Sequence, residues 1–182
     1  MKALLIIDML NDFVTGTLAC ERAHRIIPNI QELAEAYRAA NQPVIYNNDA
    51  HLLEVDAEFD IWSPHAVQGT EGAEVIPELE PKEGDIIIPK RRYSGFTGTD
   101  LHQQLQEYGV DTVVLTGLHT NMCLRHTSYD AFLNGYAIEV PKDCADAFEA
   151  KDHEEGLEYI NKMYGGVITS SRELIEDLQV AG

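Results

Sequence analysis

Basic side chains are scarce in this chain of 182 residues. It contains 13 Lys and Arg against 31 Asp and Glu, which gives a formal net charge of −18 at pH 7. Proteins that bind nucleic acid or anionic membranes need basic patches that neutralise phosphates or lipid headgroups. The composition therefore argues against nucleic acid and against a membrane surface as a partner.

Cysteines and long hydrophobic runs are also few. Cys20, Cys123 and Cys144 are an odd number at irregular spacing without a C-x-x-C pair, so they indicate a reducing compartment rather than a disulfide framework. The apolar run after Met1 ends already at Asp8, and no stretch reaches the roughly 18 apolar residues of a membrane span. We expect neither a signal peptide nor a membrane helix, and hence a cytoplasmic protein.

What the chain does contain is an alternation of apolar runs of strand length with amphipathic stretches of helix length. We predict strands at residues 3–7, 43–47, 85–89, 112–116, 136–140 and 167–169. We predict helices at residues 27–40, 99–108, 121–134, 152–164 and 171–178. Strands that are apolar throughout are typical of a parallel sheet covered by helices on both faces. We therefore expect one α/β domain over residues 1–182, a three-layer α/β/α fold with a six-stranded parallel sheet.

Reactive side chains gather at the carboxyl ends of the predicted strands. The first strand is followed by Asp8, the second by Asp49 and His51, the third by Lys90 and the fourth by Cys123. In parallel sheets of this kind the ligand crevice lies at that edge. Polar residues scattered at random would not gather there, so the pattern favours an enzyme.

Cys123 falls in the first turn of the helix predicted at 121–134. Unpaired backbone N–H groups and the helix dipole favour a thiolate there, which makes Cys123 a candidate nucleophile. The alternative is a small buried hydrophobic residue. Asp8 is the candidate base for the thiol proton and Lys90 the candidate positive charge, unless they are a turn cap and a solvated surface lysine.

A second candidate group lies in the long segment 48–70, which lacks clear periodicity. It consists of Asp49, His51, Glu58 and His65. Two imidazoles with carboxylates suit a divalent transition metal that keeps open positions, although surface histidines would explain the pair equally well. On chemical grounds alone, Asp56 or Asp60 could replace Glu58.

Three aromatic residues form a third candidate group. Phe13, Trp62 and Tyr93 each lie in a loop within a few residues of Asp8, His65 and Lys90, respectively. Core packing is the alternative for each residue alone. Their shared location predicts a flat substrate slot with aromatic walls.

Four stretches carry a resemblance to a known family: LLIIDMLNDF, SPHAVQGTEGAEVIPEL, KRRYSGFTGTDL and VVLTGLHTNMCLRHTSYDAFLNGY. Through them the chain resembles the isochorismatase-like cysteine hydrolases over nearly its whole length, and it is most similar to the metal-dependent nicotinamidases. The resemblance implies an amidase that converts nicotinamide and water to nicotinate and ammonia through a thioester.

The resemblance also assigns roles to residues. It implies a catalytic triad of Asp8, Lys90 and Cys123. It implies metal ligands Asp49, His51 and His65, with Glu58 as the fourth protein ligand of one nicotinamidase subgroup. It implies substrate-binding residues Phe13, Trp62, Tyr93, Leu118 and His119, the last two joined by a cis peptide bond. The implied cofactor is a divalent metal ion that binds the pyridine nitrogen, zinc first, with iron or manganese as alternatives.

Two neighbours of Cys123 depart from the nicotinamidase pattern. Nicotinamidases usually carry an acidic residue where this chain has Asn121, and His119 is unusual in its turn. Asn is common at that position in relatives that act on other amides, ureas and carbamoyl compounds. The alternatives are therefore an amidohydrolase for such a compound, or an inactive binding protein on the same fold. As partners we expect a small-molecule amide and, in a homo-oligomer, further copies of the chain.

Overall fold

The computed structural model describes residues 1–181, so the last residue of the expected domain, Gly182, lies outside the described part. Its sheet contains β1 (Lys2–Ile7), β2 (Val44–Asp49), β3 (Ile86–Lys90), β4 (Thr112–Leu118), β5 (Ala137–Pro141), β6 (Ala145–Asp146) and β7 (Val167–Thr169). The main strand order is β3-β2-β1-β4-β5-β7, and β6 pairs with the end of β4. All pairs are parallel.

The sheet has seven strands rather than the six that we predicted, with six of them on the main path. The additional strand is β6, which has only two residues, Ala145–Asp146. A pair of residues is too short to produce an apolar run, so no pattern in the sequence indicated it.

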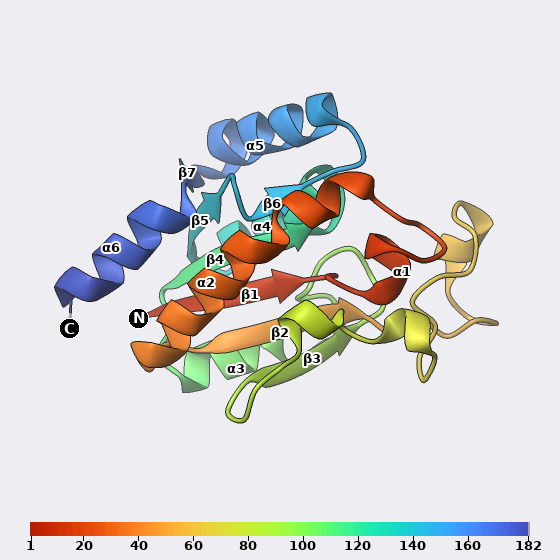
Figure 1. The fold of residues 1–182 in the computed structure, drawn as a ribbon, viewed down its shortest axis with the longest axis horizontal. Coiled ribbons are helices and arrows are strands. Elements are labelled where there is room, and N and C mark those ends of the chain that lie inside the picture. The colour runs from red at the N-terminus through yellow and green to blue at the C-terminus, as the bar shows by residue number, and fades with distance from the viewer. Residues whose placement is uncertain (182) are drawn as a thin grey trace.

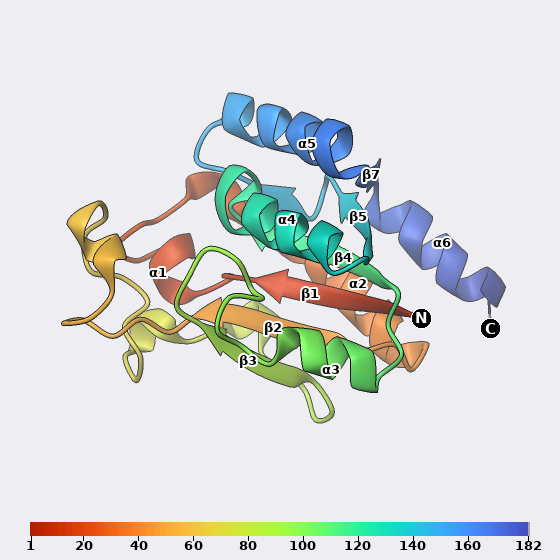
Figure 2. The same cartoon turned by 180° about the vertical axis from the view of Figure 1, so that it is seen from behind.

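Helices cover both faces of the sheet, as predicted. They are α1 (Asn11–Val14), α2 (Ile27–Ala39), α3 (Leu101–Glu107), α4 (Arg125–Leu133), α5 (Ala150–Tyr164) and α6 (Ser171–Ala181). Figure 1 shows α2 and α6 in front of the sheet, and Figure 2 shows α3, α4 and α5 on the opposite face. Side chains of β1 alternate between the two resulting cores, with Leu4 and Ile6 in one and Leu5 and Ile7 in the other. Burial on both faces explains why this strand is apolar throughout.

The helix predicted at 121–134 differs in its first turn. Residues Thr120–Leu124 form a π-helical turn, and the α-helix begins at Arg125. The four-residue helix α1 was not predicted, because it is too short to display a helical period. Among residues 1–181, no helix combines the length and the apolar character that crossing a membrane requires.

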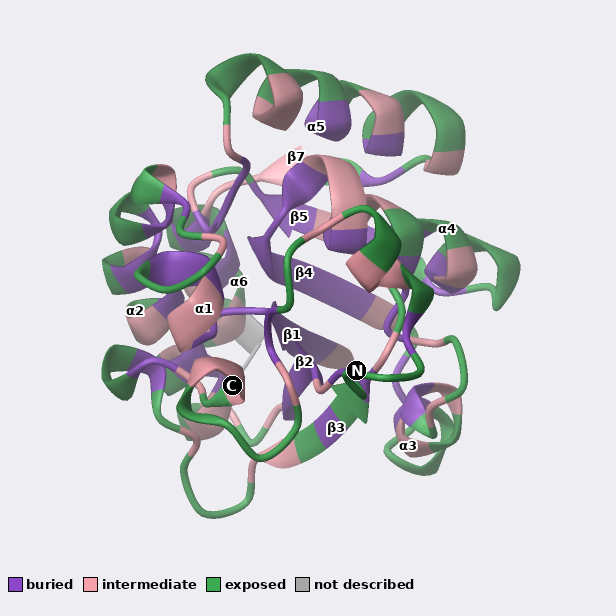
Figure 3. Cartoon of the chain, turned by 90° about the vertical axis from the view of Figure 1, so that its right-hand side faces the viewer, coloured by how far each residue is buried: buried purple, intermediate pink, exposed green. Residues whose placement is uncertain are grey.

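The segment after β2 forms a loop whose two stems are hydrogen-bonded to each other. The N–H of His51 donates to the carbonyl of Ala66 at 2.9 Å, and the N–H of Gln68 donates to the carbonyl of His51 at 2.9 Å. These bonds bring His65 back beside the carboxyl end of β2. In Figure 1 the loop lies at the right, beyond the strand tips, and Figure 3 looks onto that edge with the buried strands at the centre.

Candidate active site

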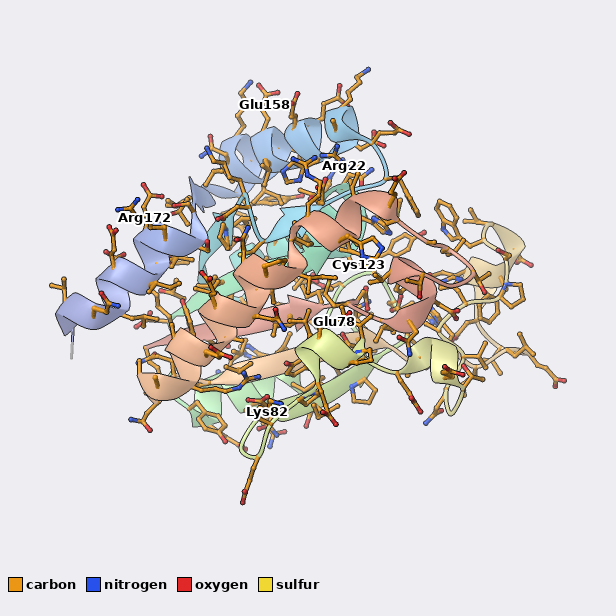
Figure 4. All side chains as sticks on the ribbon, in the orientation of Figure 1. Arg22, Glu78, Lys82, Cys123, Glu158 and Arg172 are labelled. Carbon is orange, nitrogen blue, oxygen red and sulfur yellow. The ribbon has the colours of Figure 1, made fainter. Side chains whose placement is uncertain are left out.

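Lys90 is the centre of a buried charged cluster at the carboxyl edge of the sheet. Its ammonium donates to Oδ2 of Asp8 at 2.9 Å and to Oδ1 of Asp49 at 2.5 Å. Its Nζ lies 3.6 Å from Sγ of Cys123. All four side chains are buried, Cys123 with 5% exposure. The structure thus brings together the three residues that we predicted as a catalytic set, and Figure 4 labels Cys123 near the middle of the view.

Asp8 is held in place by the backbone around it. Its φ is 55°, a conformation that a non-glycine residue adopts only where its surroundings enforce it. Its N–H donates to Oδ1 of Asn48 at 2.9 Å, and its Oδ1 accepts from the N–H of Asp49 at 2.8 Å. These contacts fix one carboxylate oxygen, so the other is directed at Lys90.

The protonation states follow from burial. Burial raises the pKa of Asp8 to about 6, the carboxylate of Asp49 adds to this, and Lys90 opposes it. Burial alone would lower the pKa of Lys90, but Asp49 and Asp8 raise it well above its usual value. Lys90 is therefore charged, while Asp8 titrates close to neutral pH and suits a proton-transfer role.

The prediction that Cys123 loses its proton easily is wrong for the resting site. Burial raises the pKa of Cys123 well above its usual value, and Lys90 only partly opposes this. The charge of Lys90 is shared with two carboxylates, and Cys123 sits in a π-helical turn rather than at the start of an α-helix. The thiol is therefore neutral at rest and needs a base. A carboxylate oxygen of Asp8 lies within 4.8 Å of its sulfur.

The four predicted metal ligands also come together. Asp49, His51, Glu58 and His65 each offer an atom within 4.8 Å of the others. Nε2 of His51 lies 3.5 Å from Oδ2 of Asp49 and 3.5 Å from Oε2 of Glu58. Nε2 of His65 lies 3.9 Å from the same Glu58 oxygen. Asp60, which the sequence left open as a replacement for Glu58, is exposed and outside this group.

These side chains fit a divalent metal ion. Nε2 of His51 is buried and has no hydrogen-bond partner among the described residues, although it faces two carboxylates. Burial raises the pKa of Glu58 to about 7, and the neighbouring Asp49 adds to this. Two imidazoles and two carboxylates are a donor set used for zinc and for other first-row metals. A bound cation would pair with the His51 nitrogen and offset the repulsion between the carboxylates.

A cavity opens between the two clusters. It is lined by Asp8, Phe13, Leu18, Asp49, Glu58, Trp62, His65, Tyr93, His119, Met122, Cys123 and Phe148. The predicted aromatic residues are thus in its wall, and Nε1 of Trp62 donates to the hydroxyl of Tyr93 at 3.0 Å. Leu118 is not among the residues that line the cavity, and its side chain is buried in the core, so its assignment as a substrate-binding residue stays a prediction.

Phe148 is the main cavity residue that the sequence did not reveal. Its ring stacks on His119 with centroids 4.1 Å apart and packs against Trp62 at 6.4 Å. It follows β6, so recognising that two-residue strand would have placed it at the same sheet edge as Cys123.

The turn before Cys123 contains the cis peptide bond Leu118–His119, as the resemblance implied. The N–H groups of Met122 and Leu124 donate to the carbonyl of His119 at 3.0 and 3.2 Å. Burial lowers the pKa of His119 to about 4, so its ring is neutral. Both ring nitrogens are without a hydrogen-bond partner in the described part of the chain.

Comparison with known proteins identifies relatives that cover most of the chain. The family described as Isochorismatase domain matches residues 2–172. N-carbamoylsarcosine amidase from Thermoplasma acidophilum is 37% identical with a TM-score of 0.88, over 93% of this chain and 96% of that one. Nicotinamidase from Bacillus subtilis is 32% identical with a TM-score of 0.88, over 93% and 99% of the two chains. Pyrazinamidase of Pyrococcus horikoshii in complex with zinc is 31% identical with a TM-score of 0.86, over 93% and 98%.

Proposed function

The chain belongs to the isochorismatase family, and on that premise we propose that it is an amidohydrolase with a cysteine nucleophile. Nicotinamide is the first substrate to consider. The observation that carries the proposal is the position of Cys123, with its sulfur 3.6 Å from Lys90 and within 4.8 Å of Asp8, in the wall of an aromatic cavity. The similarity to a nicotinamidase and a pyrazinamidase supports it.

The reaction begins with the neutral thiol. As the substrate excludes the remaining water, Asp8 accepts the proton of Cys123 and the thiolate attacks the carboxamide carbon. Lys90 stabilises the negative charge that forms during this transfer. Backbone N–H groups of the turn hold the oxyanion. The candidates are those of His119 and Cys123, because the N–H groups of Met122 and Leu124 donate to the His119 carbonyl.

The tetrahedral intermediate then collapses. Asp8 returns its proton to the leaving nitrogen, ammonia departs, and the acyl group remains on Cys123 as a thioester. Water, deprotonated by Asp8, attacks the thioester carbon. The carboxylic acid leaves and the thiol regains its proton. One water is consumed for each amide, and the same carboxylate serves as base and acid in both halves.

Asp49, His51, Glu58 and His65 would hold the metal ion, and zinc is our first choice because the similar pyrazinamidase is described with zinc. When bound, such an ion supplies a Lewis-acid contact that orients a substrate nitrogen, with iron and manganese as alternatives. The aromatic side chains of Phe13 and Trp62 would hold a flat ring between them.

A second candidate is an amidohydrolase for a ureido or carbamoyl compound. Two observations favour it: Asn121 replaces the usual acidic residue, and His119 places a neutral polar ring in the cavity wall. The similarity to an N-carbamoylsarcosine amidase points the same way.

Ammonia release separates the two candidates. The wild type and Cys123→Ala would be assayed with nicotinamide, pyrazinamide, N-carbamoyl amino acids and ureido compounds, with and without chelator. Turnover of nicotinamide that is lost in the variant supports the first candidate. Turnover of carbamoyl compounds alone supports the second, and turnover of none of these compounds contradicts the proposed function.

A further inference from the structure

Asp56 is a buried carboxylate beside the candidate metal site but not in it. We propose that Asp56 is a positioning residue: it holds the His51 ring with its proton on Nδ1, so that the lone pair of Nε2 faces Asp49, Glu58 and His65. The inference rests on the metal site of the proposed function. The sequence left Asp56 open as a replacement ligand for Glu58. In the structure Asp56 lies on the side of the His51 ring that faces away from the candidate metal site, because it contacts Nδ1 and not Nε2.

Both carboxylate oxygens of Asp56 accept hydrogen bonds from neighbouring groups. Oδ2 lies 3.1 Å from Nδ1 of His51 and accepts the N–H of Leu52 at 2.9 Å. Nε of Arg91 donates to both oxygens at 3.0 and 3.1 Å, its terminal nitrogen donates to Oδ1, and Arg92 donates to Oδ1 at 3.1 Å. The side chain of Asp56 has no exposed surface. Paired with two guanidinium groups, it is ionised and acts only as an acceptor.

The tautomer of His51 follows from this geometry. A carboxylate that only accepts requires a proton on Nδ1, which leaves Nε2 of a neutral ring as a lone pair. The surroundings of Nε2 support the same tautomer. A protonated Nε2 would donate to Asp49 or Glu58 at an ordinary hydrogen-bond distance, whereas both carboxylates lie 3.5 Å away. A lone pair directed at two carboxylates is arranged for a cation.

Asp56 also joins the two clusters of the site. Arg91 directly follows Lys90, the ammonium that contacts Asp8 and Asp49. Asp56 therefore ties the loop that carries His51 to the end of β3 that carries Lys90. His65 is oriented differently, because its Nδ1 contacts the neutral carbonyl of Ser63 at 2.8 Å. Of the two imidazoles, only that of His51 is oriented by a charged group.

The test compares Asp56→Asn with Asp85→Asn. Asp85 is a matched control, since its side chain is 3% exposed and accepts from Arg38 at 3.0 and 2.8 Å and from the N–H of Lys82 at 2.7 Å. Among residues 1–181, no hydrogen bond joins Asp85 to a histidine. Metal-free protein would be titrated with Zn²⁺ against a chromophoric chelator. We expect Asp56→Asn to bind Zn²⁺ about 10- to 100-fold more weakly, and Asp85→Asn to bind as the wild type does.

The tautomer is measured directly by two-bond ¹H–¹⁵N correlation spectra of the metal-free proteins. We expect His51 protonated on Nδ1 alone in the wild type and in Asp85→Asn, and a mixture of tautomers in Asp56→Asn. A wild-type His51 protonated on Nε2 overturns the inference even where the variant does not fold. Equal Zn²⁺ affinity of Asp56→Asn and wild type overturns it while the metal site stands. A wild type that binds no Zn²⁺ overturns the metal site and this inference together.

Discussion

The candidate catalytic cluster and the candidate metal cluster lie at the same edge of the sheet, yet their charges are balanced differently. In the catalytic cluster, the ammonium of Lys90 lies between the carboxylates of Asp8 and Asp49, and the thiol beside it is neutral. In the metal cluster, Nε2 of His51 faces carboxylates at 3.5 Å without a hydrogen bond. The first cluster pairs its charges within the chain, whereas the second leaves Nε2 of His51 without a hydrogen-bond partner in the described residues, an arrangement that fits a bound cation.

Asp49 belongs to both clusters. Its Oδ1 accepts from Lys90 at 2.5 Å, while its Oδ2 faces His51. Burial alone would raise the pKa of Asp49, but Lys90 and His51 together outweigh burial and hold that pKa below its usual value. Asp49 therefore stays ionised for both roles. We assign the chemistry to the first cluster and the positioning of the substrate to the second.

The largest effect is expected from removing the nucleophile. Cys123→Ala should reduce ammonia release by about 10⁴-fold or more, because no thioester can form. Cys144→Ala is the matched control, since Cys144 is also buried but does not line the cavity. It should retain activity. Thermal unfolding followed by circular dichroism checks that both variants are folded. Full activity of Cys123→Ala would contradict the assignment of Cys123 as the nucleophile.

The next effect concerns the stability of the first cluster. Lys90→Met leaves Asp8 and Asp49 buried without their cation, and breaking such a pair costs about 3–5 kcal/mol of unfolding free energy. Lys162→Met is the control, because Lys162 and Glu158 form an exposed pair on α5. Its cost should stay below about 1 kcal/mol. Urea unfolding measures both, and equal costs would show that Lys90 is not the structural centre of the cluster.

Removal of the metal should affect binding more than chemistry. With nicotinamide as substrate, chelation or His51→Ala should raise KM by about tenfold or more, because the ion orients the ring. The rate at which a small thiol reagent modifies Cys123 should change little. Steady-state kinetics and alkylation rates test this, and an unchanged KM after complete removal of the metal would contradict the division of roles.

The smallest effect is the pH dependence of the first cluster. Asp8 must be ionised to accept the thiol proton, and its pKa is raised to about 6. kcat/KM should therefore rise with pH and level off above 7, and at pH 5 it should be about tenfold below the plateau. Metal content would be measured at each pH, so that loss of the ion is not mistaken for protonation of Asp8. A flat profile between pH 5 and 7 would exclude Asp8 as the base.

Much of the architecture and most of the site could be predicted because both depend on short patterns. Apolar runs of strand length marked every strand of the main sheet. Asp8 directly follows β1, Lys90 ends β3, and Cys123 lies in the turn after β4. Their meeting is a consequence of parallel topology. The protonation of Cys123 could not be predicted, because it depends on how much water the fold removes around the sulfur.

The roles of Asp56 and Glu58 show another limit. Both are acidic and only two positions apart, so composition and spacing treat them alike. Asp56 immediately precedes the short 3-10 helix Ala57–Asp60 and Glu58 lies within it, so Asp56 is at one side of the His51 ring and Glu58 at the other. Phe148 was missed for a related reason, since it follows a strand of only two residues.

The loop between His51 and Val67 has hydrogen-bonded stems, so exposed side chains between the stems can be substituted without loss of the stem contacts. His51 and Val67 form a β-bridge, so both ends of the loop are fixed to each other rather than to its tip. Leu53, Val55 and Ile61 lie between the stems and are 53%, 65% and 75% exposed. Substitutions confined to these three exposed side chains would therefore change the outer surface of the loop, while the stems hold both histidines in register and Asp56, Glu58 and Trp62 keep their places in the site.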